Sequence, residues 1–556
     1  MEQFIKMTYP KIPLAQSVIE IFRVQGIKNI VISPGSRNAP LTIGFVNNPY
    51  FNCYSIADER CAAFFAIGIA QQLQEPVAVI CTSGSALLNY YPAFAEAFYN
   101  QIPFIVVSAD RPANKIDIGD GQTIRQQNVF DNHSLFNANL TENNSAENDI
   151  KIQEAILAAI EKRGPVHINA PFEEPLYETT EKLEVAPIYI SKKNIRKKSE
   201  NLLDFAKIWN NSKKKMIVVG EYFPDAIDDA ITNQLGNDNS VVVMTETISN
   251  WHHDSFVNNI DTIITPFSDE DFRNFQPEIL ITFGGMIVSK RIKVMLRKYK
   301  PAHHWHIDAL RAYDVFGCLT HHFECDINDF FNEFLPLTQS IESDYNQQLQ
   351  KIKTIRAAKH IEYLANIPFS DFKAFESVFP SLPKKSMLQL GNSSTVRYAQ
   401  LFEIEKSIAI FCNRGTSGID GCTSTAIGAA VASERQTIFI TGDVSFLYDS
   451  NALWNNYIPE NFKIIVVNNG GGGIFRILPG HDETPVFNTF FETSHCLTAE
   501  HLAKMYNFDY SIASSVETLE LQLKNFYSID KPAILEVFTP TKSNDLYLLD
   551  YFKHLV

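Results

Sequence analysis

Short apolar segments alternate with helical patterns along most of this chain, and the alternation is the first guide to its fold. In the first part of the chain, apolar segments at residues 30–32, 77–81 and 105–107 each end in polar residues. Residues 59–73 and 86–99, between these segments, are rich in Ala, Phe and Leu and predict helices. Apolar strands that alternate with helices are typical of a parallel sheet covered on both faces. Because ligands bind beyond the carboxyl ends of the strands in such sheets, we expect functional residues in the polar stretches that follow them.

The same alternation recurs twice further along the chain. A middle section is predicted from apolar segments at 216–219, 241–244, 279–283 and 305–307. A third section is predicted from segments at 387–390, 408–411, 436–440, 463–467 and 533–538. The basic stretch SKKNIRKKSEN at 191–201 and a mixed polar stretch at 338–368 separate the sections. We therefore predict an α/β fold of three doubly wound parallel-sheet domains, at residues 1–188, 200–340 and 365–556.

Composition and charge narrow the class of function. The chain has 556 residues, of which 45% are hydrophobic and 20% charged, as is typical of globular proteins. Its formal net charge of −15 argues against a general surface for nucleic acid or anionic membrane. The first residues lack the apolar core of a signal peptide, and no apolar run approaches the ~18–20 residues of a membrane span. We expect a cytoplasmic protein with no membrane span and no nucleic-acid partner.

The eight cysteines are scattered without a CxxC pair, which indicates free thiols in a reducing compartment. One stretch, CLTHHFEC from Cys318 to Cys325, holds zinc-type ligands. Its spacing matches none of the usual structural zinc patterns, so we expect no zinc there. We interpret the fourteen histidines, including His303, His304 and His306, as structural.

Polar residues end two successive apolar segments in the third section. Gly442-Asp443 follows one segment, and Asn468-Asn469 with four glycines follows the next. A single helix, predicted at 446–457, fits between them, so the two strands should be parallel neighbours about 4.8 Å apart. An Asp carboxylate, an Asn carbonyl and a backbone carbonyl among the glycines form an oxygen set that suits Mg²⁺ bound to phosphate. The alternative is a plain loop with Asp443 as a helix cap, and the spacing of the two motifs favours the metal and phosphate site.

The arrangement of Gly-Asp followed by Asn-Asn resembles the diphosphate-binding motif of thiamine-diphosphate enzymes. Val444 departs from it, because the family often has Gly-Asp-Gly. The resemblance implies that Asp443, Asn469 and the carbonyl of Gly471 bind Mg²⁺ or Mn²⁺, with a pyrimidine-binding first domain and a diphosphate-binding third domain. Further cofactor contacts are implied at Ser83, Gly84, Ser393, Arg414, Ile419, Gly442, Ser445, Gly472 and Ile474, and Ile419 should support the bent cofactor from beneath.

The resemblance also implies a Glu in the first domain that hydrogen-bonds the cofactor's aminopyrimidine ring. The candidate is Glu59 in SIADERCAAFFAIGIA, at the start of a strongly apolar helix. An acid in a first helical turn is also favoured by the helix dipole alone. The motif Thr82-Ser83-Gly84 at the next strand end favours the catalytic interpretation.

Several cations stand at strand ends of this acidic chain, and any one of them could be an ordinary surface ion-pair partner. Together they indicate a substrate with several carboxylates, because Arg binds carboxylates with two hydrogen bonds. They are Arg37, Arg111, Arg125, Lys290, Arg291, Arg397 and Arg414.

Stretches such as ISPGSRNAPL, TSGSALLNYYPA, GQTIRQ and NRGTSGIDG narrow the resemblance to synthases of menaquinone biosynthesis. It implies decarboxylation of 2-oxoglutarate and Michaelis-type addition of the resulting enamine to isochorismate. It places Ser393 and Arg397 near both substrates, and substrate contacts at Ser36, Arg37, Arg111, Gln122, Lys290 and Arg291. A homodimer or tetramer with active sites at the subunit interface is implied, and we expect the middle domain to hold no flavin or nucleotide.

Two other functions remain open at this point. A different thiamine-diphosphate lyase, such as an acetolactate synthase-like enzyme, would need fewer cations. A non-catalytic nucleotide-binding protein with three α/β domains is disfavoured, because the Walker and Rossmann glycine patterns are missing.

Overall fold

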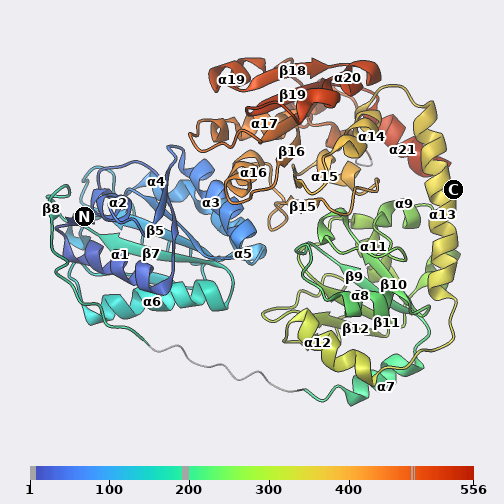
Figure 1. Cartoon of the computed structure of the whole chain (residues 1–556), viewed down its shortest axis with the longest axis horizontal. Helices are drawn as coiled ribbons and strands as arrows, with labels where there is room; N and C mark the ends of the chain where they lie inside the picture. Colours follow the sequence, from blue (N-terminus) through green and yellow to red (C-terminus); the bar gives the residue numbers. More distant parts are fainter. Residues whose placement is uncertain (1–7, 191–199, 478–479, 481) are drawn as a thin grey trace, which may run out of the picture. The chain divides into compact units, whose positions relative to one another are not determined.

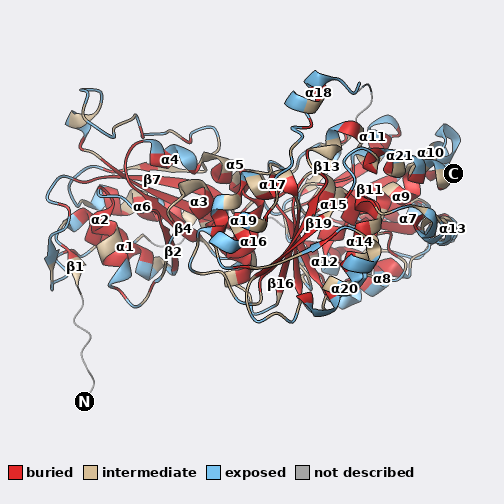
Figure 2. Ribbon diagram, turned by 90° about the horizontal axis from the view of Figure 1, so that it is seen from above, coloured by how far each residue is buried: buried red, intermediate tan, exposed pale blue. Residues whose placement is uncertain are grey.

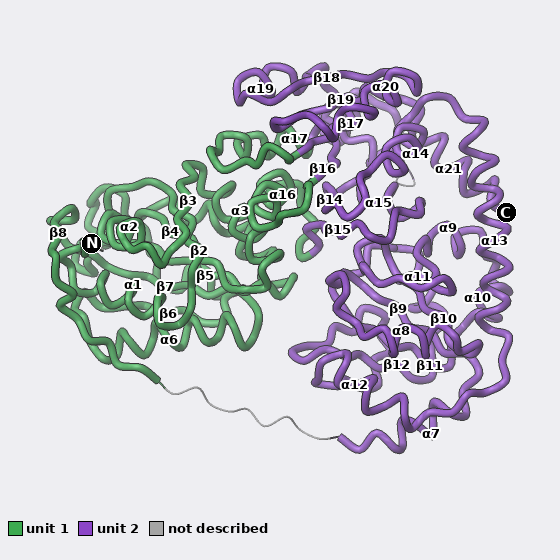
Figure 3. Tube along the Cα trace, in the orientation of Figure 1, with its two compact units in different colours: residues 1–194, 415–437, 445–462 green, residues 195–414, 438–444, 463–556 purple. Residues whose placement is uncertain are grey.

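The computed structural model describes residues 8–190, 200–477, 480 and 482–556. The predicted linker at 191–201 lies almost wholly outside the described residues. The chain divides into two compact units (Figure 3), each of which is described by itself below. Unit 1 comprises residues 1–194, 415–437 and 445–462, and unit 2 comprises residues 195–414, 438–444 and 463–556.

Unit 1 contains a six-stranded parallel sheet with the strand order β3-β2-β4-β5-β7-β6. The strands are β2 (Asn29–Ile32), β3 (Asn52–Ser55), β4 (Val77–Cys81), β5 (Phe104–Asp110), β6 (Asn137–Asn139) and β7 (Pro165–Pro171). Helices α1 (Pro13–Gln25), α2 (Ala39–Val46) and α6 (Ala146–Glu161) share an apolar core with one face of the sheet. Helices α3 (Glu59–Leu73), α4 (Ser85–Asn89) and α5 (Tyr91–Tyr99) cover the other face (Figure 1).

The single helix predicted at 86–99 is wrong, because α4 ends before Tyr90 and α5 begins at Tyr91. Proline lacks the amide hydrogen that a helix interior requires, so Pro92 is suited to the first turn of a new helix. A short antiparallel pair, β1 (Tyr9–Pro10) and β8 (Thr179–Thr180), lies outside the main sheet.

Helix α16 (Cys422–Val431) packs closely on α3 within unit 1. A Cβ atom on Gly68 of α3 would lie 2.1 Å from the carbonyl oxygen of Thr425, and one on Gly428 would lie 2.0 Å from that of Phe65. The two backbones therefore touch, and only glycine fits at either position.

Unit 2 contains a middle parallel sheet with the strand order β10-β9-β11-β12-β13. Its strands are β9 (Lys215–Val219), β10 (Val241–Thr245), β11 (Ile279–Phe283), β12 (His303–Ile307) and β13 (His321–Phe323). One face packs on α7 (Leu203–Asn211), α8 (Asp229–Gly236) and α12 (Ile327–Phe334). The other face packs on α9 (Ile260–Ile264), α11 (Lys290–Lys298) and the start of α13 (Tyr345–Asn366). The polar stretch at 338–368 is thus mostly one long helix, α13.

Unit 2 also contains the third sheet, with the strand order β15-β14-β16-β17-β19-β18. Its strands are β14 (Met387–Leu390), β15 (Ala409–Cys412), β16 (Thr437–Gly442), β17 (Lys463–Asn468), β18 (Asp509–Ala513) and β19 (Ala533–Phe538). Helices α14 (Asp371–Ser381), α20 (Val516–Phe526) and α21 (Asn544–His554) share its core. Most strand residues of the three sheets are buried (Figure 2). The predicted α/β class with three parallel sheets is confirmed, and the domain boundaries stay a prediction.

The helix predicted at 446–457 is wrong in its extent. Helix α17 (Asp443–Tyr448) begins at Asp443 itself, and the 3-10 turn η4 (Ser450–Leu453) follows it. The helix ends where Asp449, which is fully buried, accepts hydrogen bonds from Ser424 of α16.

All eight cysteines are free, as predicted. Among the described residues, no helix combines the length and the apolar character that crossing a membrane demands.

Candidate active site

The strand tips of β16 and β17 bring the predicted metal residues together in unit 2. These strands are parallel neighbours, with Gly442 opposite Val467. The buried Asp443 carboxylate accepts the backbone N–H groups of Gly470 at 2.8 Å and Gly471 at 3.0 Å through Oδ2, and that of Val444 at 2.7 Å through Oδ1. A plain helix cap does not describe this carboxylate, because it holds the glycine loop of the next strand.

The glycine loop after β17 requires glycine at Gly470 and Gly471, whose φ angles are +76° and +155°. A Cβ atom on Gly471 would also lie 2.8 Å from the carbonyl oxygen of Glu492. Glu492 accepts the N–H of Gly472 through the same oxygen and forms a buried bidentate ion pair with Arg476, with Nη2 and Oε2 2.6 Å apart. The sequence did not identify Glu492 and Arg476, which fix the far side of this loop.

A second buried acid, Asp371 of α14, contacts the predicted metal ligand Asn469. Nδ2 of Asn469 donates to Oδ2 of Asp371 at 2.9 Å. Burial raises the pKa of Asp371 and that of Asp443 to about 6 each. Asp371 was not predicted, because an acid at the start of a helix reads as a capping residue in sequence.

The donor set at these strand tips fits a divalent metal with a diphosphate. A carboxylate, an amide and backbone carbonyls are hard oxygen ligands of the kind that Mg²⁺ prefers. Among the described residues, the buried hydroxyls of the predicted cofactor contacts Ser83 and Ser445 have no hydrogen-bond partner. Because buried polar atoms are rarely left unsatisfied, these hydroxyls suit contacts to a bound ligand.

Glu59 is the first residue of α3 in unit 1, after the N-cap Asp58, which accepts the N–H of Cys61. Oε2 of Glu59 accepts a hydrogen bond from Nδ2 of Asn89 at 3.3 Å. Gly84, at the next strand end, has a φ angle of +91° and donates its N–H to Oε1 of the buried Gln126 at 2.8 Å. The carboxylate thus follows β3 and the glycine turn follows β4, two strands of one sheet that both pair with β2.

The loop that carries Ile419 is anchored within unit 1 by Glu96 of α5. The buried Glu96 carboxylate accepts the N–H of Gly415 at 2.7 Å, and the N–H and hydroxyl of Thr416 at 2.6 and 2.8 Å. Gly415 has no room for a side chain, since a Cβ atom there would lie 2.5 Å from the carbonyl oxygen of Glu96. Glu96 lies in a predicted helix and outside the motifs considered above, so the sequence analysis did not identify it.

The predicted substrate residues of unit 1 differ in their surroundings. Arg37 is buried and donates to the carbonyl of Phe172 at 2.9 Å and to Glu174 at 3.1 Å, so its guanidinium is already bound within the fold. Arg111 pairs with Asp120 at 3.3 Å. Gln122 is exposed with a φ angle of +55°, and its backbone lies against Gly84.

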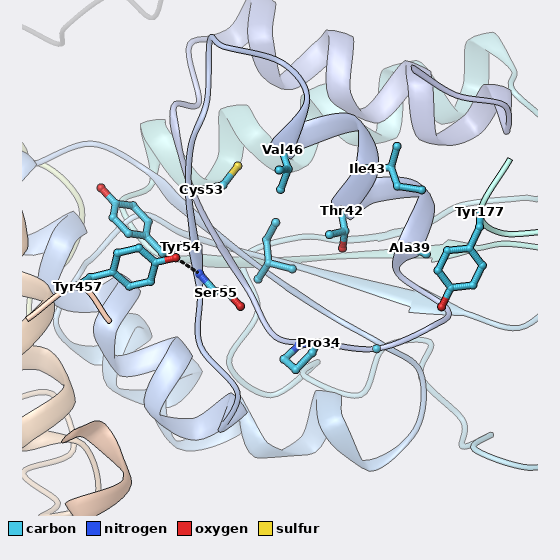
Figure 4. A pocket seen from close by; sticks show the side chains of 12 residues that line it. Pro34, Ala39, Thr42, Ile43, Val46, Cys53, Tyr54, Ser55, Tyr177 and Tyr457 are labelled. Carbon is cyan, nitrogen blue, oxygen red and sulfur yellow. Dashed lines mark hydrogen bonds between the residues drawn. The ribbon is translucent and has the colours of Figure 1, made fainter. Parts of the chain in front are cut away.

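The loop that holds Ser36 and Arg37 borders a cavity of about 430 Å³ (Figure 4). Pro34 and Gly35 line it together with side chains of α2 and β3. The hydroxyl oxygen of Tyr457 accepts the N–H of Ser55 at 2.9 Å on one side of the cavity (Figure 4).

The cations of unit 2 gather around α15 (Ser394–Ala399) and the start of α11. Burial lowers the pKa of Arg397, and the neighbouring Arg414 lowers it further. Burial also lowers the pKa of Lys293, a cation that the sequence analysis missed, and Arg414 and Arg397 contribute to the shift. The predicted Lys290 and Arg291 are exposed at the first two positions of α11. Arg397, Arg414 and Lys293 therefore influence one another electrostatically, as a site for anionic substrates requires.

Buried acids hold the start of α11 in place. Glu246 accepts the N–H groups of Val288 and Ser289 at 2.6 Å each, and Asp261 accepts the hydroxyl of Ser289. Burial raises the pKa of Glu246 to about 7.

Among the described residues, Cys318 is the member of the zinc-type stretch that belongs to a group of three possible ligands. Donor atoms of His304, Asp314 and Cys318 lie within 4.8 Å of one another, and Sγ of Cys318 is 3.8 Å from Nδ1 of His304. Burial lowers the pKa of His304 and His306 to about 4, and both rings contact the hydroxyl of Thr282 at 2.8 Å. These contacts fit neutral structural histidines.

Two family descriptions match the chain. The N-terminal TPP binding domain of thiamine pyrophosphate enzymes matches residues 12–135, and the C-terminal TPP binding domain matches residues 391–537. Thiamine pyrophosphate is another name for thiamine diphosphate. The sheets and the strand-tip site thus define a thiamine-diphosphate enzyme.

Relatives over the full length narrow this class. The chain is 68% identical to 2-succinyl-5-enolpyruvyl-6-hydroxy-3-cyclohexene-1-carboxylate synthase of Flavobacterium psychrophilum, 64% identical to that of Flavobacterium johnsoniae and 53% identical to that of Christiangramia forsetii. Each comparison covers 99% of this chain and 100% of the relative. The chain belongs to this synthase family.

Proposed function

We propose that this protein decarboxylates 2-oxoglutarate with thiamine diphosphate and adds the remaining four-carbon unit to isochorismate. The product is 2-succinyl-5-enolpyruvyl-6-hydroxy-3-cyclohexene-1-carboxylate, an intermediate of menaquinone biosynthesis. The observation that carries the proposal is 68% identity across 99% of the chain to a synthase of that product. The geometry agrees with it, since the Asp443 carboxylate contacts the glycine loop after the neighbouring strand.

Three residues of unit 2 would hold a divalent metal against the diphosphate. They are Asp443, Asn469 and Gly471, the last through its carbonyl oxygen. Bound thiamine diphosphate supplies the electron sink for decarboxylation. Ser445, whose buried hydroxyl has no partner among the described residues, is suited to a diphosphate oxygen.

The remaining site residues would contact either the cofactor's ring system or the substrates. Glu59 would hydrogen-bond the aminopyrimidine ring, and Ile419 would support the cofactor from beneath. Arg397, Arg414 and Lys293 would bind substrate carboxylates, because partly buried cations attract anions more strongly than exposed ones. Lys290 and Arg291 at the exposed start of α11 would guide the same anions to the site.

An assay of the purified protein tests the proposal. We expect product from 2-oxoglutarate and isochorismate only when thiamine diphosphate and Mg²⁺ or Mn²⁺ are present. Carbon dioxide release from pyruvate in place of 2-oxoglutarate, at equal or higher rate, would instead support an acetolactate synthase-like lyase.

Glu59→Gln tests the role of the acid in the first domain. We expect the variant to bind thiamine diphosphate with an affinity close to that of the wild type. Its turnover should fall by at least about 100-fold, because Gln cannot exchange a proton with the ring. Normal turnover in this variant would refute the assignment.

We also propose that the enzyme is a cytoplasmic homodimer or tetramer with active sites at the subunit interface. Light scattering of the purified protein measures the oligomeric state directly.

A further inference from the structure

Asp371 contacts Asn469, a residue proposed to bind the metal, through a side-chain hydrogen bond. It is the first residue of α14 and is 3% exposed. Its Oδ2 accepts the amide Nδ2 of Asn469 at 2.9 Å, and its Oδ1 accepts the hydroxyl of Thr539 at 2.5 Å. Both carboxylate oxygens therefore have fixed partners.

The two hydrogen-bond partners of the Asp371 carboxylate, Asn469 and Thr539, lie at the same edge of the third sheet. Asn468 of β17 lies opposite Phe538 of β19, so Asn469 and Thr539 are the first residues beyond two paired strands. The N–H of Thr539 donates to the carbonyl of Asn468 at 3.0 Å. In addition, the backbone N–H of Asp371 donates to Oδ1 of Asn544 at 2.8 Å. Asp371 thus joins the tips of both strands to the start of α14.

The contact decides which atom of the Asn469 amide is available to a ligand. Nδ2 is the hydrogen-bond donor of the Asn469 amide, and it is the atom that faces the acceptor Oδ2 of Asp371. Oδ1 then points away from Asp371. Among the described residues, that oxygen accepts no hydrogen bond, and so it is free to bind a cation.

We propose that Asp371 is a positioning residue that orients the Asn469 amide so that its carbonyl oxygen faces the metal. This inference rests on the proposed function, which makes Asn469 a metal ligand. Groups that orient metal ligands in this way typically change metal affinity about 10- to 100-fold when they are removed. Thr539 holds the opposite oxygen of Asp371 and so limits rotation of the carboxylate.

Binding of Mn²⁺ to the full-length apoprotein with saturating thiamine diphosphate tests the proposal without an activity assay. Free Mn²⁺ is counted by its electron paramagnetic resonance signal. We expect Asp371→Leu, which removes the acceptor, to weaken Mn²⁺ binding about 10- to 100-fold. Asp371→Asn keeps one acceptor oxygen for Asn469 and should recover most of that loss.

Exchanging the Asp371 carboxylate and the Asn469 amide distinguishes an effect on ligand orientation from an effect on folding. Asn469→Asp places two carboxylates in contact and should weaken binding. Adding Asp371→Asn to that variant restores a donor–acceptor pair, so the double variant should bind Mn²⁺ at least about fivefold more tightly than Asn469→Asp alone, a coupling that distant sites do not show. A purely structural Asp371 predicts that Asp371→Asn has the same effect in both backgrounds.

Matched controls make each result decisive. Asp149→Asn changes another buried aspartate near a helix start, on α6, and should leave the Mn²⁺ affinity within about twofold, because Asp149 accepts hydrogen bonds from Gln153 and Ile188, and neither residue is proposed to bind the metal. Mn²⁺ binding by Asp371→Leu within threefold of wild type, or an exchange variant no tighter than Asn469→Asp, would overturn the inference. If the wild type itself bound no Mn²⁺ with thiamine diphosphate, the proposed metal site would fail instead.

Discussion

Ser393, the N-cap residue of α15, lies in a backbone conformation that residues with side chains rarely adopt, with φ +75° and ψ −125°. Strain of this kind costs about 1–3 kcal/mol and concentrates at functional sites. The strain supports the predicted role of Ser393 at the cofactor and the substrates, because the fold holds its hydroxyl there at a cost in stability.

Ser393→Gly should therefore stabilise the apoprotein while it lowers activity. Glycine removes the strain but makes the unfolded chain more flexible, so the net gain is about 1 kcal/mol, or about 1–3 °C in Tm. Ser393→Ala is the control, since it loses the hydroxyl but keeps the strain. Equal losses of kcat/KM in both variants, with a higher Tm only for Ser393→Gly, would match this account, and a lower Tm for Ser393→Gly would contradict it.

The buried Asp449 should make the stability of the protein depend on pH. Burial raises its pKa to about 7 in the folded protein, from 3.8, although Arg60 at 3.6 Å and the N–H of Ser424 favour the charged form. A raised pKa means that the native state holds the proton more tightly than the unfolded chain. The resulting stabilisation is complete below pH 4 and is lost as the pH rises through about 7.

The Tm of wild type minus that of Asp449→Asn should therefore fall as the pH is raised from about 5 to about 8. The neutral amide does not titrate, and the other groups contribute equally to both proteins. Differential scanning calorimetry of the two apoproteins across this range measures the difference. A difference that stays constant or grows with pH would show that Asp449 is ionised throughout.

Motifs in the sequence identified the residues proposed to bind ligands better than the residues that hold them in place. Asp443 and Asn469 stand at strand ends, where their spacing predicts that they are neighbours, whereas Glu59 was identified through the resemblance to thiamine-diphosphate enzymes. Asp371 and Glu96 act through contacts with residues more than 90 positions away in the chain. No local sequence pattern marks such a residue, because Asp at the start of a helix and Glu on a helix face are common in proteins.

At the scale of elements, strands that form continuous apolar runs could be predicted, including the edge strands β10 and β15, and strands that polar residues interrupt could not. Most strands inside the sheets are apolar on both faces and read as continuous apolar runs. The buried interior strand β7 was missed, because His167 and Asn169 interrupt its apolar sequence. The missed strands β13 and β18 lie at sheet edges, and most of their residues are not fully buried. A half-exposed strand carries polar residues such as His321 and Asp509. It therefore lacks the continuous apolar run by which a parallel strand is recognised in a sequence.

Glu96 on helix α5 holds the loop that follows β15 through hydrogen bonds with Gly415 and Thr416. Glu96→Gln replaces one acceptor oxygen with an N–H donor that faces the N–H groups of Gly415 and Thr416. The loss of a hydrogen bond to a charged group costs about 1.5–3 kcal/mol. We expect faster hydrogen exchange in residues 413–421 and a rise of about tenfold in the thiamine-diphosphate concentration needed for half-maximal activity.

Glu154→Gln, at an exposed position of α6, is the control for Glu96→Gln and should change neither quantity. Unchanged exchange in the loop of Glu96→Gln would show that this contact does not hold Ile419 in place.

At the scale of the whole molecule, the acid proposed to hydrogen-bond the cofactor ring and the residues proposed to hold the metal come from different parts of the chain. Glu59 belongs to the first sheet and Asp443 to the third. The proposed active site at the subunit interface would combine Glu59 of one subunit with Asp443 of another, so mixing variants separates the contributions of these two residues.

Co-expression of Glu59→Gln with Asp443→Ala tests this directly, since each variant alone should be nearly inactive. In random dimers, half of the molecules combine the two variants, and one of the two sites in each then holds both native residues, which gives about a quarter of wild-type activity. Co-expression of Glu59→Gln with the double variant Glu59→Gln/Asp443→Ala is the control, because none of its sites is complete. Sites built within one subunit predict no recovery in either mixture, so activity near a quarter in the first mixture alone distinguishes an interface site from a site within one chain.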